Sequence, residues 1–409
     1  MNTNRKYGMS SVALLLVSVL LIGSIGFSEE QLPLQSSNRY DGTYSLYVSL
    51  DEGMHFNWIT GVETAGTYSL SELDGRVLKS GTTENGRVHT FSIEKQPKIP
   101  VRLEFGGESS GTEAVILYPE FDLPKSTFRK VDSLYVVGDV HGSYDQLTNL
   151  LQKARVVDSE LNWSAGEAHL VFVGDLFDRG DDVTKVLWFI HKLEPQAEAS
   201  GGKVHVLLGN HEIMTMTNDL RYLSRKEKAL SIAYKVGYDF MFHPTKSYLG
   251  SWLTHKPSVI RIDDVLFAHG GIPDLGTPQI QEFNEQAYFY LHEDMFLELT
   301  KAHADSAAYD AGEWMKRKRF FYSDMSPYWY RGYVTTDTLE EQLDVMLKKY
   351  SSKLHVVGHT SLDTIRQRYN GKLITTDLRE KATELLFLLR DGRKYSRFRI
   401  DSLGQMTEL

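Results

Sequence analysis

The pattern of hydrophobic and polar positions divides the chain into two parts. From Arg39 to about Pro119, short segments place apolar residues at every second position, and turn pairs such as Asn85-Gly86 separate these segments. Alternation with a period of two between glycine turns is typical of antiparallel strands. The spacing of the segments predicts a small all-β sandwich domain over residues 39–126.

The pattern changes near Val131. Continuous apolar runs of strand length now alternate with helical patterns, and the runs are LYVV (134–137), HLVFV (169–173), VHVLL (204–208), VLFAH (265–269) and HVV (355–357). Apolar strands with helices between them predict a sheet that is covered on both faces. We therefore expect an α/β domain over residues 127–409.

The first residues have the pattern of a targeting segment. Arg5 and Lys6 precede an apolar run over residues 12–27, and small residues lie before a cleavage site at Glu29. This predicts a secretory signal peptide over residues 1–28, followed by a polar linker over 29–38. An uncleaved membrane anchor is the alternative, although the run is short for a membrane-spanning helix. Both interpretations predict export, to the periplasm or outside the cell, with or without a membrane tether.

Charge and cysteine content narrow the classes of function. The chain of 409 residues has a net charge of −9 at pH 7, which argues against non-specific nucleic-acid binding. It contains no cysteine, which excludes disulfides, thiolate metal ligands and cysteine nucleophiles. Phosphorylated small molecules or proteins stay possible substrates, because a local metal site can outweigh the global charge.

Residues that can bind metals follow five predicted strands directly. The five motifs are Gly138-Asp139-Val140-His141-Gly142, Gly174-Asp175-Leu176-Phe177-Asp178-Arg179-Gly180, Gly209-Asn210-His211-Glu212, Ala268-His269-Gly270-Gly271 and Gly358-His359-Thr360. Each alone could be a turn or a helix cap. Ligands of α/β sheets collect at the carboxyl ends of the strands, so the five together predict one rim of oxygen and imidazole ligands. Such ligands suit Mn, Fe or Zn.

In this order the motifs resemble the calcineurin-like metallophosphoesterase superfamily. Asp-Arg-Gly after Asp175, together with Asn-His-Glu, resembles its phosphoprotein-phosphatase branch, with bacterial Shewanella-like phosphatases as the nearest relatives. The resemblance covers residues 131–380 and implies a four-layer α/β/β/α sandwich, with the small all-β domain outside it. The last motif continues with Ser361, where many superfamily members have a second histidine. This lack also fits the phosphoprotein-phosphatase branch.

The resemblance implies a role for each residue. Two metal ions would be held by six side chains, with Asp139 and His141 on the first metal, Asp175 between the two, and Asn210, His269 and His359 on the second. His211, paired with Asp178, would be the general acid, and Arg179 would bind phosphate oxygens. Arg331 resembles the second phosphate-binding arginine of bacterial relatives. Its neighbours Tyr328, Trp329 and Tyr330 are expected to form a wall of the substrate cleft, and helices over 278–325 to lie at the rim.

The function predicted from these residues is hydrolysis of phosphate monoesters by a hydroxide that bridges two metals. Two divalent ions about 3.5–4 Å apart lower the pKa of a shared water toward neutrality. We expect a protein phosphatase. A nucleotidase or dinucleoside polyphosphate hydrolase is an alternative within the same chemistry. An exported binding protein with a degenerate phosphatase domain is an alternative from another class, and the complete ligand set argues against it.

Overall fold

The computed structural model describes residues 45–409 except 124, 278, 293–310 and 393. The chain divides into two compact units, Met1–Asn38 and Arg39–Leu409, and only the second contains described residues. The predicted signal peptide and linker therefore lie outside the described residues. Among the helices that are described, none has the length and apolar character needed to cross a membrane.

The N-terminal part is all β, while a separate sandwich domain over residues 39–126 stays a prediction, because Arg39–Leu409 forms one compact unit. Its strands are β1 (Tyr47–Ser49), β2 (Met54–Glu72), β3 (Val77–Ile93), β4 (Val101–Gly107) and β5 (Thr112–Leu117). All are antiparallel, in the order β1-β2-β4-β5 with β3 also paired to β2. Hydrogen bonds thus join the five strands in one sheet, and register shifts along the β2–β3 ladder bend it. Trp58 is fully buried, and its indole N–H donates to the Gly106 carbonyl at 2.9 Å.

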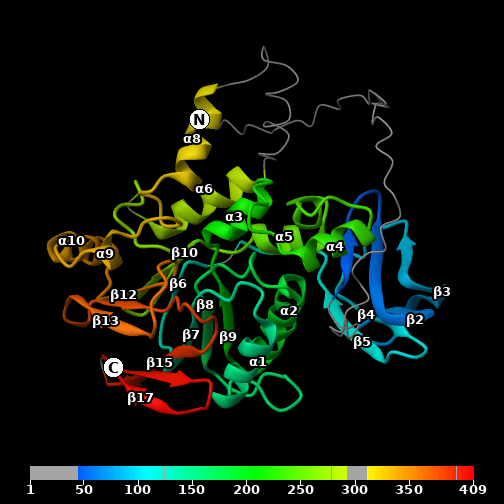
Figure 1. Cartoon of the computed structure of the whole chain (residues 1–409), viewed down its shortest axis with the longest axis horizontal. Coiled ribbons are helices and arrows are strands. Elements are labelled where there is room, and N and C mark those ends of the chain that lie inside the picture. The colour runs from blue at the N-terminus through cyan, green and yellow to red at the C-terminus, as the bar shows by residue number, and fades with distance from the viewer. Residues whose placement is uncertain (1–44, 124, 278, 293–310, 393) are drawn as a thin grey trace, which may run out of the picture. The chain divides into compact units, whose positions relative to one another are not determined.

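Two six-stranded sheets form the second part (Figure 1). The first has the order β13-β14-β12-β11-β10-β6, with β6 (Thr127–Phe128), β10 (Val259–Ile262), β11 (Val265–Ala268), β12 (Leu354–Val357), β13 (Arg366–Arg368) and β14 (Leu373–Thr375). The second has the order β17-β16-β15-β7-β8-β9, with β7 (Ser133–Val137), β8 (His169–Phe172), β9 (Lys203–Val206), β15 (Glu384–Asp391), β16 (Lys394–Asp401) and β17 (Met406–Glu408).

The two sheets pack face to face through side chains that are almost all aliphatic. Val136 and Val171 of one sheet belong to the same buried cluster as Ile260, Phe267 and Val356 of the other. Sheets packed in this way share a core about 10 Å thick. Helices cover the outer faces, which gives the predicted α/β/β/α layers (Figure 1).

The described helices lie between the strands, as their apolar spacing predicts. They are α1 (Tyr144–Lys153), α2 (Val183–Ala199), α3 (Asn210–Met216), α4 (Arg225–Ala233), α5 (Tyr248–Thr254), α6 (Ile280–His292), α8 (Ala311–Tyr322), α9 (Gly332–Thr335) and α10 (Glu340–Lys349), with the short 3-10 helices η1 (Phe240–Phe242) and η2 (Tyr369–Gly371). Helix α1 illustrates the pattern, because Leu147, Leu150 and Leu151 are all fully buried on one face.

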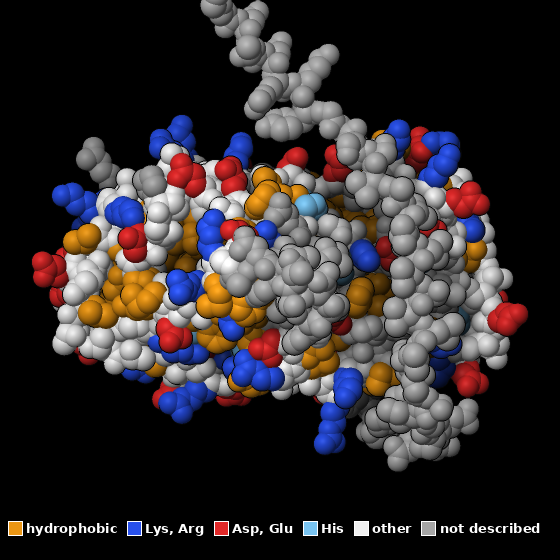
Figure 2. All heavy atoms as spheres, turned by 90° about the horizontal axis from the view of Figure 1, so that it is seen from above, with side chains coloured by type: hydrophobic (Ala, Val, Ile, Leu, Met, Phe, Trp, Pro, Cys, Tyr) orange, Lys and Arg blue, Asp and Glu red, His pale blue; other side chains and the backbone are white. Residues whose placement is uncertain are grey.

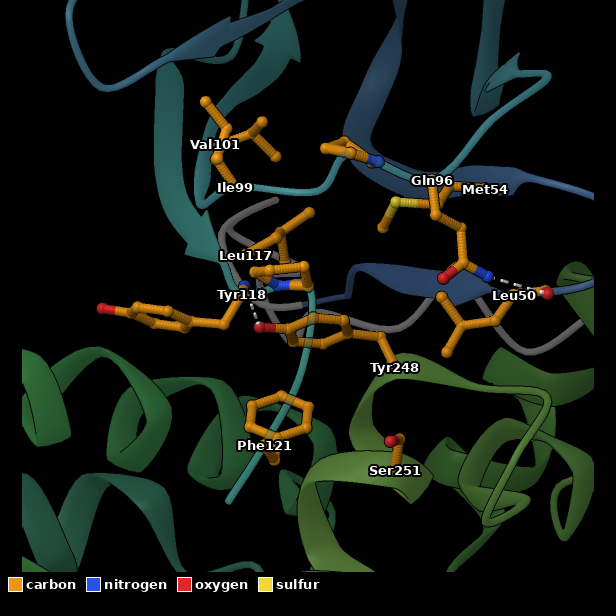
Figure 3. Close-up of a pocket in the computed structure, with 12 residues that line it drawn as sticks. Leu50, Met54, Gln96, Ile99, Val101, Leu117, Tyr118, Phe121, Tyr248 and Ser251 are labelled. Atoms are coloured by element: carbon orange, nitrogen blue, oxygen red, sulfur yellow. Dashed lines mark hydrogen bonds between the residues drawn. The ribbon is translucent and has the colours of Figure 1, made fainter. Parts of the chain in front are cut away.

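The N-terminal sheet is attached to these helices by hydrogen bonds. Strand β1 forms an antiparallel bridge between Ser49 and Ser247, and Leu50 N–H donates to the Lys246 carbonyl at 2.9 Å. Tyr248 is buried at this junction, and its hydroxyl accepts from Tyr118 N–H at 2.8 Å (Figure 3). A cavity of about 30 Å³ beside it has room for water but not for a ligand.

Viewed from above, the molecule shows the side on which α6 and α8 lie in Figure 1. Lysine and arginine side chains are interspersed there with aspartate and glutamate, and hydrophobic side chains gather between them (Figure 2). The predicted rim helices are present as α6 and α8, and residues 293–310 between them lie outside the described part. Helix α8 carries four basic residues in a row over 316–319, of which Lys316 is exposed and Arg317 is buried.

Candidate active site

Five strands deliver the predicted ligands to one place. Strands β7 and β8 run parallel, as do β11 and β12, so their carboxyl ends share an edge. Asp139 follows β7, Asp175 follows β8, Asn210 begins α3 after β9, and His269 and His359 follow β11 and β12. All of these side chains are buried, as is His141. The structure therefore brings together the six residues predicted to hold metals.

The loops that carry these residues have an unusual backbone. His141, Asp175, Asp178, Arg179 and His359 all have φ between 47° and 68°. Residues with a Cβ atom rarely adopt this left-handed conformation, and it concentrates at functional sites. Gly174 beside them has φ of 97°, and a Cβ there would lie 2.6 Å from the backbone N of Gly209.

The first group of candidate ligands surrounds His141. Its Nε2 atom lies 3.9 Å from Asp139 Oδ2 and 3.7 Å from Asp175 Oδ2. These distances exceed a hydrogen bond, and Nε2 is buried without a hydrogen-bond partner among the described residues. An orphaned buried nitrogen facing two carboxylates needs a cation, because an unpaired buried polar atom is costly.

The second group surrounds His269. Its Nε2 atom lies 3.2 Å from Asp175 Oδ1, 2.9 Å from Asn210 Oδ1 and 3.1 Å from Nδ1 of His359. Asp175 thus offers one carboxylate oxygen to each group. A carboxylate placed in this way could hold two divalent ions, one on each oxygen.

Backbone carbonyl oxygens determine which ring nitrogen carries the proton in three of the histidines. His141 Nδ1 faces the Phe177 carbonyl at 2.6 Å, His269 Nδ1 faces that of Val173 at 2.9 Å, and His359 Nε2 faces that of Trp329 at 3.1 Å. A carbonyl oxygen only accepts, so each of these nitrogens carries its proton. In the neutral rings the opposite nitrogens point lone pairs into the site. Such fixed tautomers are usual for metal-binding histidines.

Burial and charge act together on these side chains. Burial lowers the pKa of His141 to about 3 and that of His359 to about 2, so both rings are neutral at pH 7. Burial alone would also lower the pKa of His269, but Asp175, Asp139 and other carboxylates raise it to about 9. The cluster therefore attracts positive charge at its centre, and a metal ion would compete there with a proton.

The residues present fit divalent metal ions. Oxygen and imidazole donors converge from both sides of Asp175, and no thiolate is needed. Asp139 and His141 would complete one site, and Asn210, His269 and His359 the other. Since His211 lies with His141 and Asp175 inside one possible ligand group, the geometry alone is compatible with a metal-binding role for His211 as well.

His211 has different contacts from the predicted ligands. Its Nδ1 lies 2.6 Å from Asp178 Oδ2, and its Nε2 lies 3.4 Å from a terminal nitrogen of Arg179 and 3.8 Å from Asp175 Oδ2. Asp178 is buried, while Arg179 is exposed above the site, where its guanidinium lies near the ring of Tyr222. The predicted trio of Asp178, Arg179 and His211 is therefore assembled next to the bridging carboxylate.

Arg331 lies on the other side of the site. Its guanidinium donates to the carbonyl of His359 and lies 3.4 Å from Thr360 Oγ1. Trp329 packs edge-on against the His359 ring at 5.7 Å. The expectation that Tyr328 forms part of the cleft wall is wrong, because its ring is fully buried and its hydroxyl bonds to Ser258 at 2.5 Å.

Glu212 organises the turn that carries Asp175, a role that the sequence motifs do not predict. Its buried carboxylate accepts hydrogen bonds from the backbone N–H groups of Asp175, Leu176 and Gly209 at 2.9, 2.7 and 2.6 Å. It thereby holds the turn that carries the bridging carboxylate against the start of α3. Its position directly after His211 in the Asn-His-Glu motif is the only signal in the sequence.

Comparison with known proteins decides the family. The sequence profile described as calcineurin-like phosphoesterase matches residues 133–362, which is more than half of the chain. The chain belongs to the calcineurin-like phosphoesterase family. Membership makes it a phosphoester hydrolase that uses divalent metal ions, in agreement with the converging ligands.

Individual relatives within the family include two kinds of enzyme. Shewanella-like protein phosphatase 2 of Arabidopsis thaliana is 37% identical over 105 residues, which are 26% of this chain and 27% of that protein. Shewanella-like protein phosphatase 1 of Plasmodium berghei is 24% identical over 253 residues, 58% of this chain and 65% of that one. The symmetrical bis(5'-nucleosyl)-tetraphosphatase of Vibrio campbellii is 31% identical over 143 residues, 34% of this chain and 45% of the enzyme.

Among solved structures, the chain is similar to the cold-active protein-tyrosine phosphatase of a psychrophilic Shewanella species. The TM-score is 0.68 with 27% identity, and the match covers 89% of this chain and 98% of that one. The likeness therefore extends well beyond residues 133–362.

Proposed function

We propose that the protein is a phosphomonoesterase that removes phosphate from phosphoproteins. The observation that carries this proposal is the pair of converging ligand groups on either side of Asp175, flanked by two arginines. Arg179 lies on the His211 side and Arg331 on the His359 side. A phosphoryl group placed between them would accept hydrogen bonds from guanidinium groups on two sides. Their positive charges would stabilise the negative charge on the three equatorial phosphoryl oxygens in the transition state.

Each residue has a distinct task in this proposal. Two divalent ions would supply Lewis-acid activation of water and neutralise charge on the phosphoryl oxygens. Arg179 and Arg331 bind the phosphoryl oxygens and hold phosphorus in line. His211, oriented by Asp178, donates a proton to the leaving oxygen. The phosphatase names of the Arabidopsis and Shewanella relatives support a phosphoprotein substrate.

Hydrolysis of dinucleoside polyphosphates is the second candidate. The Vibrio tetraphosphatase supports it, since that relative is 31% identical over a third of this chain. Steady-state rates on a phosphotyrosine peptide, a phosphoserine peptide and diadenosine tetraphosphate distinguish the two. A kcat/KM for the nucleotide that exceeds both peptide values would reject the phosphoprotein proposal.

The metals and the location belong to the proposal as well. Mn, Fe or Zn suit the oxygen and imidazole ligands, and the segment 1–28 supports export to the periplasm or beyond. The first experiment is phosphate release from p-nitrophenyl phosphate by residues 29–409, metal-free and after addition of Mn, Fe or Zn. Activity only with metal is expected. A folded protein that is inactive with every metal would favour the binding-protein alternative.

A further inference from the structure

Ser361, Asp377 and Lys381 form a polar cluster outside the ligand groups described above, in which Asp377 is buried and the other two side chains are half-buried. Asp377 is 1% exposed, although a carboxylate is among the groups least often buried. Ser361 Oγ donates to its Oδ2 at 2.6 Å, and the Lys381 ammonium pairs with its other oxygen. Lys381 Nζ also lies 3.4 Å from Ser361 Oγ. The three side chains thus form one closed polar network.

The cluster lies directly behind the end of strand β7. A Cβ atom on Gly138 would lie 2.1 Å from the carbonyl oxygen of Thr376 and 3.0 Å from the backbone N of Asp377. The chain around Asp377 therefore packs against the residue that precedes Asp139. The negative charge of Asp377 therefore acts on the carboxylate of Asp139.

The same cluster holds the loop that carries His359. The Leu362 N–H donates to the Asp377 carbonyl at 3.0 Å, and the His359 N–H donates to Asp139 Oδ1 at 3.1 Å. Ser361 stands two residues after His359, so its hydrogen bond to Asp377 also ties this loop to the cluster. The first group would give its metal three protein ligands, whereas the second group would give four.

We propose that Asp377, held by Ser361 and Lys381, is a positioning residue for the first metal. Its carboxylate adds negative charge behind Asp139, in the group that offers one protein ligand fewer, and fixes the loop from His359 to Ser361. This inference rests on the two-metal function proposed above. Lys381 balances the charge of Asp377 and keeps the carboxylate in place.

Titration of the metal-free protein with Mn²⁺ by calorimetry tests this directly. The unaltered protein is expected to bind two equivalents. Asp377→Asn is expected to weaken one of them about tenfold to a hundredfold, as other changes behind metal ligands do, and to leave the second unchanged. Two equivalents bound by Asp377→Asn with unaltered affinities would overturn the proposal. Failure of the unaltered protein to bind metal would instead reject the two-metal function itself.

Two further variants separate charge from folding. Glu384→Gln is the matched control, because Glu384 accepts from Thr364 Oγ1 at 2.8 Å and Ile365 N–H at 2.9 Å in the same stretch of chain. It should keep both affinities. Lys381→Met leaves Asp377 without its counter-ion and should bind Mn²⁺ at least as tightly as the unaltered protein. Weakening in Lys381→Met as large as in Asp377→Asn would overturn the charge role and leave only a structural one.

Discussion

The Nδ1 atom of His211 lies 2.6 Å from a carboxylate oxygen of Asp178, and both side chains are buried. The other nitrogen of the ring faces Asp175 and Arg179. A buried carboxylate fixes the orientation of the imidazole, so that its Nε2 atom faces the site. His211 is therefore placed to give a proton to a leaving group beside the bridging carboxylate.

Replacing His211 should separate proton donation from metal binding. His211→Asn is expected to lower kcat about a hundredfold or more on a serine phosphate, whose leaving alkoxide needs a proton. The loss on p-nitrophenyl phosphate should be much smaller, because that leaving group is stable as an anion. Metal content, measured by mass spectrometry, should stay at two equivalents. Loss of one metal would make His211 a ligand.

Replacing the bridging carboxylate should affect both metals. Asp175 offers one oxygen toward His141 and the other toward His269. Asp175→Asn removes the shared negative charge, so kcat/KM is expected to fall by at least about a thousandfold. Asp219→Asn, at a half-buried carboxylate paired with Arg221, is the control and should retain activity. Turnover near normal in Asp175→Asn would refute the two-metal assignment.

The two arginines should contribute to binding of the phosphoryl group. Arg179→Ala and Arg331→Ala are each expected to lower kcat/KM about tenfold to a hundredfold, since each removes charge-assisted hydrogen bonds to phosphate. Inhibition by inorganic phosphate should weaken in parallel. Arg221→Ala is the control, because Arg221 pairs with Asp219 on the surface. Equal inhibition by phosphate in Arg331→Ala and in the unaltered protein would show that Arg331 does not bind the phosphoryl group.

Glu227 should make stability depend on pH. It is buried, accepts from Thr184 N–H at 3.0 Å, and burial raises its pKa from 4.5 to about 7. The folded state then holds a proton that the unfolded chain releases above about pH 4.5. Glu227 therefore stabilises the folded state fully below that pH. The free energy of unfolding falls by about 3 kcal/mol as the pH rises to 7. Glu227→Gln should lack this slope in urea unfolding at saturating metal, and an unchanged slope would contradict it.

Most of the site could be predicted because its residues follow strands in short glycine-rich motifs. The order of strands brings Asp139, Asp175 and His269 to one rim, and each motif is local in the sequence. Strand periodicity likewise predicted both the antiparallel N-terminal strands and the α/β part. These features depend on neighbours along the chain.

The remainder depends on tertiary contacts that leave little trace in the sequence. Glu212 acts through backbone N–H groups more than thirty residues away, and Asp377 acts on Asp139, which follows a strand of the other sheet. Tyr328 was placed in the cleft because it is next to Trp329 and Tyr330, yet it packs against Phe321 in the interior. Whether an aromatic residue faces the cleft or the core depends on the loop's path, which periodicity does not give.

The N-terminal strands and the residues beside them provide partners for buried groups of the α/β part. The Leu46 carbonyl accepts the indole N–H of Trp188 at 2.7 Å, and the β1–β5 sheet covers Tyr248 of helix α5. A protein that begins at residue 127, shortly before the region of family resemblance, would leave the buried indole N–H of Trp188 unpaired and expose a wide apolar face. We expect such a fragment to aggregate. The smallest catalytically competent fragment should therefore include the N-terminal strands.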